Sequence, residues 1–315
     1  MLSVTVNSCI EACIPIGLEK CEIIICDNSD TDKYPLLNAV LPIGYIKDGL
    51  LKIFRQDFPC LFTARETAIE HSQGEYIICV DSHMLIGHNT FYDMLKFMER
   101  RKYDQSIAFA HAPINWSNKH TRNARHDRDM DTNELGDWHK AYQTARTITW
   151  KGMPWICRKS IWKEIKGYGA LSQHRISWGG GDMHIGIKPW LLGYTNWAIP
   201  TRPCIHIGPF PKIDNTKNPN VVKVSQGDGY KYRLWSESGT GPHALGFLVS
   251  CYVLGGERMM SRNRKAITKR FGQFINVDQW WQRAMIYGKD EKAWLDENKK
   301  LTFEQLLERK PWDEA

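Results

Sequence analysis

The chain has 315 residues, 42% of them hydrophobic and 24% charged, which suits one large or two modest globular domains with a substantial core. No apolar run approaches the about 20 residues of a membrane span, and the N-terminus lacks the basic start and long apolar core of a signal peptide, so the sequence predicts neither. The net charge of +7 permits an anionic partner, such as a nucleotide or nucleic acid, without requiring one.

The nine cysteines favour an intracellular protein with free thiols. Their number is odd, no two form a Cys-x-x-Cys pair, and several lie inside apolar runs, as Cys26 and Cys79 do. Buried thiols of this kind are typical of reducing compartments, whereas a disulfide framework or a zinc site needs cysteines in suitable pairs. We therefore expect a cytoplasmic protein.

The first elements in chain order alternate between strand and helix. Residues 21–26 (CEIIIC) form an apolar run that ends in Asp27 and an acidic loop, which predicts a buried strand followed by a turn. Residues 61–72 have helical spacing with Gly74 as a stop, and residues 76–80 (YIICV) predict a second buried strand.

The alternation continues with an amphipathic helix over residues 91–101 and a strand over residues 106–110. This order predicts an α/β fold with a mostly parallel sheet flanked by helices. Ligands of such sheets bind beyond the carboxyl ends of the strands, and Asp27 and Asp81 both lie at such ends.

Later elements are less regular. Residues 115–137 are polar and predict a long surface excursion. Residues 178–182 (WGGGD) open a predicted helix that runs to residue 192, and residues 198–207 predict a strand that ends near His206.

The chain therefore divides into three parts. Residues 1–208 hold the strand and helix alternation and form the predicted catalytic domain. Residues 209–246 are rich in Gly, Pro, Asn and Lys and predict a flexible flap, and residues 247–315 predict a mainly helical C-terminal extension.

Asp81 and His83 are candidate metal ligands at the end of the strand over residues 76–80. Side chains two residues apart in an extended segment point to the same side, so a carboxylate oxygen and an imidazole nitrogen could reach one divalent ion. His206, at the end of a later strand, could complete the set. Mn²⁺ accepts mixed oxygen and imidazole ligands, and Mg²⁺ is the alternative ion. Taken alone, the motif also fits an ordinary turn aspartate beside an exposed histidine.

The surrounding sequence resembles a known family. Arg65, a helix, an apolar strand and then Asp81-Ser82-His83 follow one another as in the first half of GT-A fold glycosyltransferases, whose Asp-x-Asp motif follows such a strand. The Asp-x-His variant resembles the motif of the polypeptide N-acetylgalactosaminyltransferases within the family 2-like group. Residues 177–182 (SWGGGD) and 203–208 (PCIHIG) resemble that family's Trp-Gly-Gly-Glu-Asn and Pro-Cys-Ser-x-Val-Gly blocks, so the resemblance covers roughly residues 22–208.

The resemblance implies a role for each matching residue. Asp27 would contact the base or ribose of a nucleotide-sugar donor, and Arg65 would lie near its diphosphate. Asp81 and His83 would hold Mn²⁺, with His206 as third ligand. The donor-binding and catalytic residues implied in this way include Asp81, Trp178, Gly180, Gly181 and Asp182.

Asp182 has more than one interpretation. In an inverting enzyme it would be the general base that deprotonates the acceptor hydroxyl. In a retaining enzyme the leaving phosphate takes that proton and Asp182 positions the acceptor, and the Asp-x-His motif favours this outcome. An aspartate favoured by the helix macrodipole is the purely structural alternative.

The resemblance also predicts contributions from the flap and a difference at the N-terminus. Tyr232 and Arg233 would add stacking and cationic contacts to the donor, although a solvated linker fits the flap equally well. GT-A domains of this kind begin with an apolar strand, whereas residues 1–20 here favour a helix. We therefore expect the first strand of the sheet to be missing.

A basic stripe recurs at helical spacing in the C-terminal extension. It consists of Arg258, Arg262, Lys265 and Lys269. Such a stripe contacts a phosphate backbone in some proteins and is merely solvated in others, and the solvated interpretation is favoured.

The leading functional prediction is a metal-dependent glycosyltransferase that moves a sugar from a nucleoside-diphosphate donor, UDP-sugar first, to a hydroxyl acceptor. A glycan, a small molecule, a protein side chain and a modified DNA base all remain open as acceptors. Two other functions remain open as well. One is a nucleotidyltransferase of related fold, and the other is a non-catalytic nucleic-acid-binding protein that works through the basic stripe.

Overall fold

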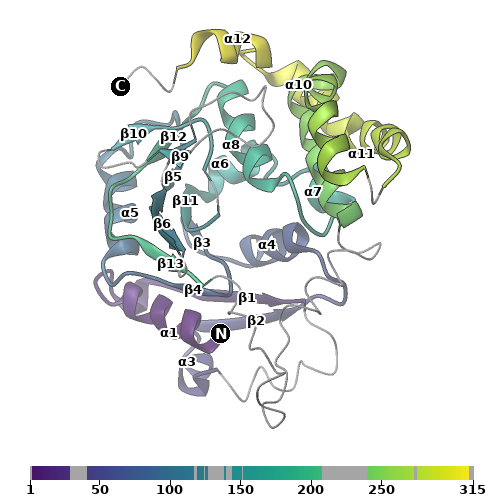
Figure 1. Cartoon of the computed structure of the whole chain (residues 1–315). Coiled ribbons are helices and arrows are strands. Elements are labelled where there is room, and N and C mark those ends of the chain that lie inside the picture. Colours follow the sequence, from purple (N-terminus) through teal and green to yellow (C-terminus); the bar gives the residue numbers. More distant parts are fainter. Residues whose placement is uncertain are drawn as a thin grey trace.

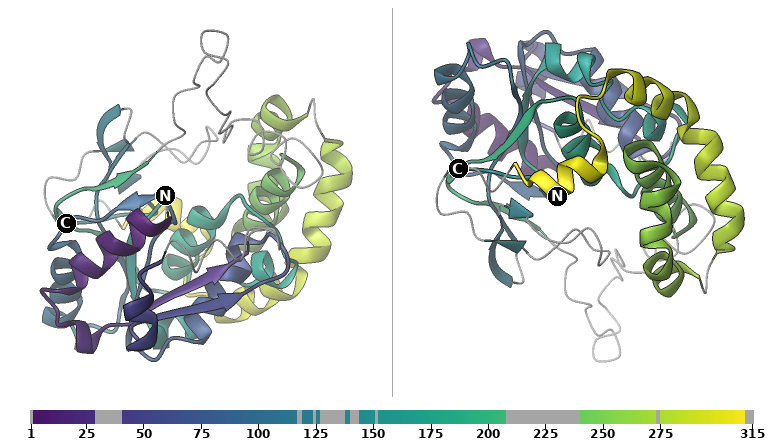
Figure 2. Two further views of the ribbon diagram at one scale, coloured as in Figure 1. Left: turned by 90° about the horizontal axis from the view of Figure 1, so that it is seen from below. Right: turned by 90° about the horizontal axis from the view of Figure 1, so that it is seen from above.

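The structure is a computed structural model of the chain that describes residues 2–28, 41–116, 119–123, 125–126, 138–139, 144–150, 152–207, 240–272 and 275–311. Sheets lie at the centre of the molecule, with helices around them (Figure 1). The long C-terminal helices stand along one side of this body, away from the N-terminal helix, in both views of Figure 2.

The strands are β1 (Ile23–Asp27), β2 (Leu51–Arg55), β3 (Tyr76–Cys79), β4 (Met84–Leu85), β5 (Ile107–His111), β6 (Ile114–Trp116), β7 (Lys119–Asn123), β8 (Arg125–His126), β9 (Trp138–His139), β10 (Ala145–Arg146), β11 (Trp155–Arg158), β12 (Thr195–Ala198) and β13 (Cys204–His206). The helices are α1 (Leu2–Cys13), a 3₁₀ turn η1 (Leu18–Lys20), α3 (Ile43–Lys47), α4 (Leu61–Glu70), α5 (Thr90–Arg100), α6 (Lys159–Glu164), α7 (Ala170–Gln173), α8 (Gly181–Leu191), α10 (Thr240–Phe271), α11 (Val277–Asn298) and α12 (Phe303–Arg309).

The central sheet has five strands in the order β10-β12-β5-β11-β3. Strands β3 and β5 of the predicted alternation run in the same direction as β12, because β12 pairs parallel to β5 and the antiparallel β11 lies between β5 and β3. The sequence predicted a mostly parallel sheet, and β11 and β10 make the observed sheet mixed. In the described residues no helix separates β5 from β11, and their antiparallel pairing does not need the helical crossover that a parallel pair needs.

A second, parallel pair is formed by β1 and β2, in which Asp27 lies opposite Arg55. Helix α1 and the turn η1 precede this pair, and β1 is the first strand among the described residues. Helix α1 buries Val6 and Ile10 against this pair, with Leu51 of β2 in the same cluster.

The strand predicted over residues 198–207 is wrong in its extent. The segment contains the end of β12, in the central sheet, and β13, which pairs with β4 and β6 in another sheet. Pro200 and Pro203 lie between the two. Proline lacks the backbone N–H that a ladder needs, so the chain leaves one sheet here and joins the other.

The polar excursion over residues 115–137 includes strands that the sequence analysis did not predict. Strand β7 pairs antiparallel with β6, and β8 pairs with β9. Strand β6 also pairs with β13, which pairs with β4, so these strands and β7 form a four-stranded sheet. Strand β13 of this sheet ends in His206.

The C-terminal helices share the main core with the sheet. Buried residues of α10, such as Leu248 and Val253, belong to the same apolar cluster as Phe109 of β5. Helix α10 begins at Thr240, seven residues before the predicted start of the extension at residue 247, and it is kinked at Gly256. In the described part of the chain, no helix combines the length and apolarity needed to cross a membrane.

Candidate active site

Two sheet edges bring the predicted metal ligands together. Asp81 and His83 lie in the short connection between β3 and β4, and His206 is the last residue of β13. Strand β13 runs antiparallel to β4 with His206 opposite Met84, and the Ile207 N–H donates to the carbonyl of His83 at 2.9 Å. This pairing places the two histidines side by side although they are 123 positions apart in the sequence.

The three side chains form one cluster. One ligand atom from each of Asp81, His83 and His206 lies within 4.8 Å of the other two, and no other such group occurs among the described residues. The Nε2 atom of His206 lies 3.5 Å from Oδ2 of Asp81, and the two imidazole rings meet edge to face at 4.4 Å. One carboxylate oxygen and two imidazole nitrogens suit Mn²⁺, and they leave positions open for other ligands.

Arg65 sets the charge of this cluster. It comes from α4 and donates through Nη2 to Oδ1 of Asp81 at 2.7 Å and through Nη1 to the hydroxyl of Tyr168 at 2.8 Å. Because Arg65 engages Oδ1, the other oxygen of Asp81 faces His206. The guanidinium is thus fixed beside the cluster.

The protonation states suit metal binding. Burial alone would raise the pKa of Asp81, but the hydrogen bond from His206 and the charge of Arg65 outweigh it and lower the pKa to about 2. Burial lowers the pKa of His83 below its usual value. Near neutral pH this leaves a carboxylate and a neutral imidazole, which are the forms that bind metals.

The segment from Trp178 to Asp182, called the Trp178 loop below, connects α7 to the first turn of α8 and contacts α10. Gly180 has a φ of 73°, and a Cβ there would meet the carbonyl oxygen of Gly246 at 2.5 Å, so only glycine fits. Ser250 of α10 donates to the Gly180 carbonyl at 3.2 Å. The ring of Trp178 lies 4.2 Å from that of His243 and is 39% exposed.

Asp182 lies in the first turn of α8. Its Oδ2 accepts a hydrogen bond from the backbone N–H of Gly152 at 3.0 Å. The pKa of Arg65 is raised above its usual value. Burial lowers it, but Tyr168, Cys79 and the carboxylates of Asp81 and Asp182 outweigh burial. Asp182 is therefore close enough to Arg65 to raise the pKa of its guanidinium. Gly181 begins α8 in close contact with Phe62, which a Cβ would meet at 2.4 Å.

The remaining predicted residues are not part of the cluster around Asp81. Asp27, at the end of β1, forms an ion pair with Arg55 of β2 at 2.8 Å. Tyr232 and Arg233 lie outside the described residues. Among the basic stripe, Arg258 is 68% exposed and lies 3.6 Å from Glu304.

Arg55 and Tyr168 contact two predicted site residues, Asp27 and Arg65, but were not themselves predicted from the sequence. Arg55 had a usable signal, because two parallel strands that both end in a charged residue place these residues opposite each other. Tyr168 had none, since its contact with Arg65 joins residues 103 positions apart.

Comparison with known proteins agrees with this description. The sequence model for glycosyl transferase family 2 matches residues 1–158. No curated protein matches the chain significantly.

One solved structure shares the fold at low identity. GalNAc-T7 with UDP, GalNAc and Mn²⁺ aligns with a TM-score of 0.64 and 16% identity, covering 98% of this chain and 53% of that one. This chain therefore spans about half the length of that structure. S. aureus TarS 1–349 in complex with UDP-GlcNAc has a TM-score of 0.49 with 12% identity, and covers 94% of this chain and 79% of that one. The mannosyltransferase PcManGT from Pyrobaculum calidifontis, with GDP-Man and Mn²⁺, has a TM-score of 0.48 with 13% identity, and covers 92% and 82%.

The fold and the cluster at the strand ends define a GT-A type glycosyltransferase domain. The chain belongs to glycosyl transferase family 2.

Proposed function

We propose that the protein transfers a sugar from a nucleoside diphosphate, UDP in the first instance, to a hydroxyl acceptor in a metal-dependent reaction. The observation that carries the proposal is the cluster of Asp81, His83 and His206 with Arg65 bonded to it, at the strand ends of a family 2 domain. The structure of GalNAc-T7 with UDP, GalNAc and Mn²⁺, which has a similar fold, supports this choice.

Asp81, His83 and His206 would hold Mn²⁺ or Mg²⁺ at this place. The ion would neutralise the negative charge that grows on the diphosphate as the bond between sugar and phosphate breaks. Arg65 binds the same diphosphate from the other side of Asp81, because its guanidinium is held there by Asp81 and Tyr168. These side chains therefore bind and orient the leaving group.

Asp27 and Arg55 are proposed to contact the nucleoside. Their ion pair stands at the carboxyl ends of β1 and β2, and both side chains are largely buried. A carboxylate accepts hydrogen bonds from the N–H groups of a base or from ribose hydroxyls, and a guanidinium donates to base carbonyls. The pair thus presents both kinds of partner to the base.

The Trp178 loop is proposed to bind the sugar and the acceptor. The half-exposed face of Trp178 suits stacking on a sugar ring. Asp182, anchored by the Gly152 N–H, positions the acceptor hydroxyl. In the retaining outcome that we favour, the leaving phosphate oxygen takes the proton of that hydroxyl. In an inverting reaction, Asp182 would take it instead.

A thermal-shift screen of nucleotide sugars with and without Mn²⁺ tests the proposal. A ligand that binds the folded state raises its melting temperature, so the donor should do so only when Mn²⁺ is present. The same donor is then supplied with water as acceptor, and its hydrolysis is measured. The anomeric configuration of the sugar transferred to an acceptor distinguishes retention from inversion.

The His83→Ala variant should lose both the Mn²⁺-dependent shift and hydrolysis. His88→Ala is the matched control, because His88 is an exposed histidine only five positions further along the chain. Binding of DNA with no response to Mn²⁺ or any nucleotide sugar would overturn the proposal and support the non-catalytic alternative.

A further inference from the structure

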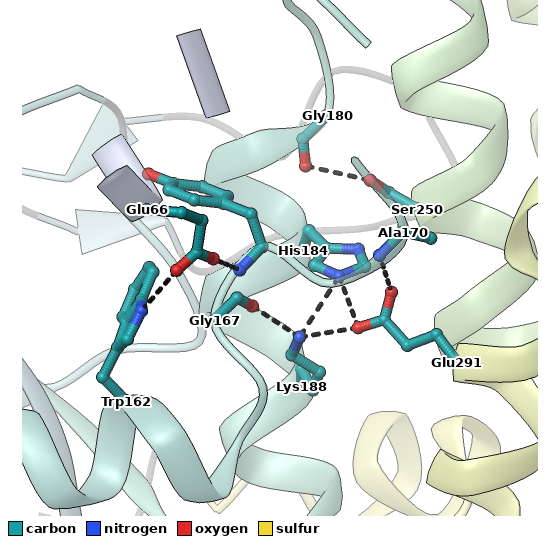
Figure 3. A network of polar contacts seen from close by, with 10 residues as sticks. Glu66, Trp162, Gly167, Ala170, Gly180, His184, Lys188, Ser250 and Glu291 are labelled. Atoms are coloured by element: carbon teal, nitrogen blue, oxygen red, sulfur yellow. Dashed lines mark hydrogen bonds and ion pairs between the residues drawn. The ribbon is translucent and has the colours of Figure 1, made fainter. Parts of the chain in front are cut away.

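A buried cluster of charged side chains joins the C-terminal helices to the helix that follows the Trp178 loop. Its members are Glu291 of α11 and His184 and Lys188 of α8, whose side chains are 3%, 0% and 0% exposed (Figure 3). Oε1 of Glu291 lies 2.9 Å from Nε2 of His184 and 2.7 Å from Nζ of Lys188. These contacts fix α11 to α8.

The second oxygen of Glu291 binds a different segment. Oε2 accepts a hydrogen bond from the backbone N–H of Ala170 at 2.6 Å, at the start of α7 (Figure 3). Ala170 precedes the Trp178 loop, and His184 follows it. One carboxylate therefore holds both ends of the chain segment that carries Trp178 and Asp182.

The entry to that segment is held from two further directions. Lys188 donates to the carbonyl of Gly167 at 2.6 Å, and a carboxylate oxygen of Glu66 accepts from the backbone N–H of Tyr168, also at 2.6 Å. Tyr168 in turn accepts from Arg65 beside the metal cluster. Tyr168 is thus held by Glu66 and Arg65, whereas Glu291 itself bonds to Ala170, His184 and Lys188.

The backbone is shaped to admit the carboxylate. Gly169 has a φ of 48°, and a Cβ at this position would meet Oε1 of Glu291 at 2.1 Å. Any other residue at position 169 would displace Glu291 from Ala170. The approach of the carboxylate and the conformation of the turn before α7 therefore depend on each other.

The Glu291 carboxyl group is ionised in this cluster. Burial alone would raise the pKa of Glu291, but its electrostatic interactions and hydrogen bonds with His184 and Lys188 outweigh burial and lower the pKa well below its usual range. Burial lowers the pKa of His184, so its imidazole is neutral near pH 7. The titratable groups in this region are Glu291 on α11, His184 and Lys188 on α8, and Glu66 on α4. Burial raises the pKa of Glu66, and the charge of Lys188 partly offsets this.

Stability alone does not require such a pair, because well-packed apolar side chains of similar volume often replace a buried ion pair at no cost. What an apolar side chain cannot do is accept from Ala170 and pair with α8 at the same time. The two oxygens of Glu291 give both flanks of the Trp178 loop one fixed geometry.

We propose that Glu291 is a positioning residue for transfer, which holds Trp178 and Asp182 in place by fastening both flanks of their loop to α11. The inference rests on the proposed function, since it assigns the loop to the sugar and acceptor side of the reaction. It concerns kcat and acceptor binding, and it leaves the nucleotide and metal site unaffected.

The test compares three variants with the wild-type protein. Glu291→Met removes the carboxylate and leaves Lys188 unpaired, the double variant Lys188→Met/Glu291→Met removes both charges, and Glu291→Gln keeps one of the two acceptor oxygens. Asp296→Asn is the matched control, because Asp296 lies on the same helix and pairs with Lys292 and Lys299 at the surface. Melting temperature, the Kd for UDP with Mn²⁺, and kcat and acceptor KM for transfer are measured for each.

We expect the double variant to recover the melting temperature that the single Glu291→Met variant loses. Its kcat should nevertheless stay about 10- to 100-fold below the wild-type value while its nucleotide Kd changes by less than about twofold, because small misplacements of positioning groups cost this much. Glu291→Gln should have an intermediate kcat, and Asp296→Asn should match the wild type.

Recovery of kcat together with melting temperature in the double variant would reduce Glu291 to a structural residue and overturn the inference. Wild-type kcat in Glu291→Gln would do the same, and this outcome decides the matter if the double variant does not fold. A wild-type protein that binds no nucleotide sugar and transfers none contradicts the proposed function itself, so the two failures are distinguishable.

Discussion

Two clusters in this molecule contain the same kinds of side chain, but we propose different roles for them. The metal cluster joins Asp81 to Arg65 and His206, whose side chains are 17%, 12% and 12% exposed. The cluster of Glu291 with Lys188 and His184 has side chains that are at most 3% exposed. Each has a carboxylate, a cation and a histidine, so residue type does not separate a binding site from a structural clamp.

The difference lies in access and in the remaining hydrogen-bonding capacity. Oδ2 of Asp81 faces a histidine across 3.5 Å, which leaves the cluster able to accept an ion between its side chains. Both oxygens of Glu291 are already in contacts of 2.9 Å or less. The Asp81 cluster can therefore still bind an ion, whereas the oxygens of Glu291 are occupied by contacts within the protein.

The largest expected effect separates the two clusters by catalysis. Replacing His206 with Ala should lower Mn²⁺-dependent donor hydrolysis by at least about 100-fold, because an ion held by three protein ligands loses one of them. Calorimetric titration with Mn²⁺ checks that the metal affinity falls in parallel. Full activity in this variant would mean that His206 is not a metal ligand, and the contrast between the two clusters would then fail.

The next effect concerns stability. The Glu291→Met variant should lose about 3–5 kcal/mol of unfolding free energy, since breaking a buried pair leaves the Lys188 charge uncompensated. Asp296→Asn on the same helix should lose less than about 1 kcal/mol, because its ion pairs are at the surface. Urea unfolding measures both, and equal losses would contradict the contrast between buried and exposed pairs.

A smaller effect is expected at the Trp178 loop. Gly180→Ala introduces a Cβ that meets the Gly246 carbonyl at 2.5 Å at a φ of 73°, and it should cost about 1–3 kcal/mol. Gly44→Ala is the control, because a Cβ at Gly44 meets nothing within 4 Å. The same unfolding measurement applies, and a neutral Gly180→Ala would mean that α10 does not pack tightly on the loop.

The smallest effect concerns pH. The pKa of His184 is lowered in the folded protein by burial, whereas an unfolded histidine titrates near about 6.5. As pH falls through that value, the unfolded state takes up a proton that folded His184 does not, so stability falls. The contribution is at most about 1.4 kcal/mol per pH unit for one proton.

A His184→Gln variant isolates this contribution. Its unfolding free energy should depend less steeply on pH between about 5 and 7 than that of the wild type, because one source of differential proton uptake is gone. Other histidines, including His83, contribute to both proteins and cancel in the difference. Parallel curves would show that His184 titrates alike in the folded and unfolded states.

Local sequence patterns were sufficient for the elements around Asp81. An uninterrupted apolar run predicts β3, and the helix before it appears at residues 61–70 as α4, which was predicted over 61–72. Short-range spacing also predicts that Asp81 and His83 lie together, although Ser82 and His83 form a turn in the structure and not the extended segment that the prediction assumed. These features depend only on residues within a few positions of one another.

Long-range pairing decided the rest of the metal site. The sequence predicted one strand over residues 198–207, yet two prolines divide it, and only the pairing of β13 with β4 sets His206 beside His83. Pairing between distant strands depends on the whole sheet, which local periodicity does not encode.

The sequence by itself therefore determined the family, the α/β class and the candidate ligands, because these follow from local periodicity and short motifs. Only the tertiary structure decided what Glu291 does. Nothing near Glu291 in the sequence distinguishes it from the other acidic residues of α11, such as Asp290 and Asp296. Its burial against α8, and its two contacts with the flanks of the Trp178 loop more than 100 positions away, arise from helix packing alone.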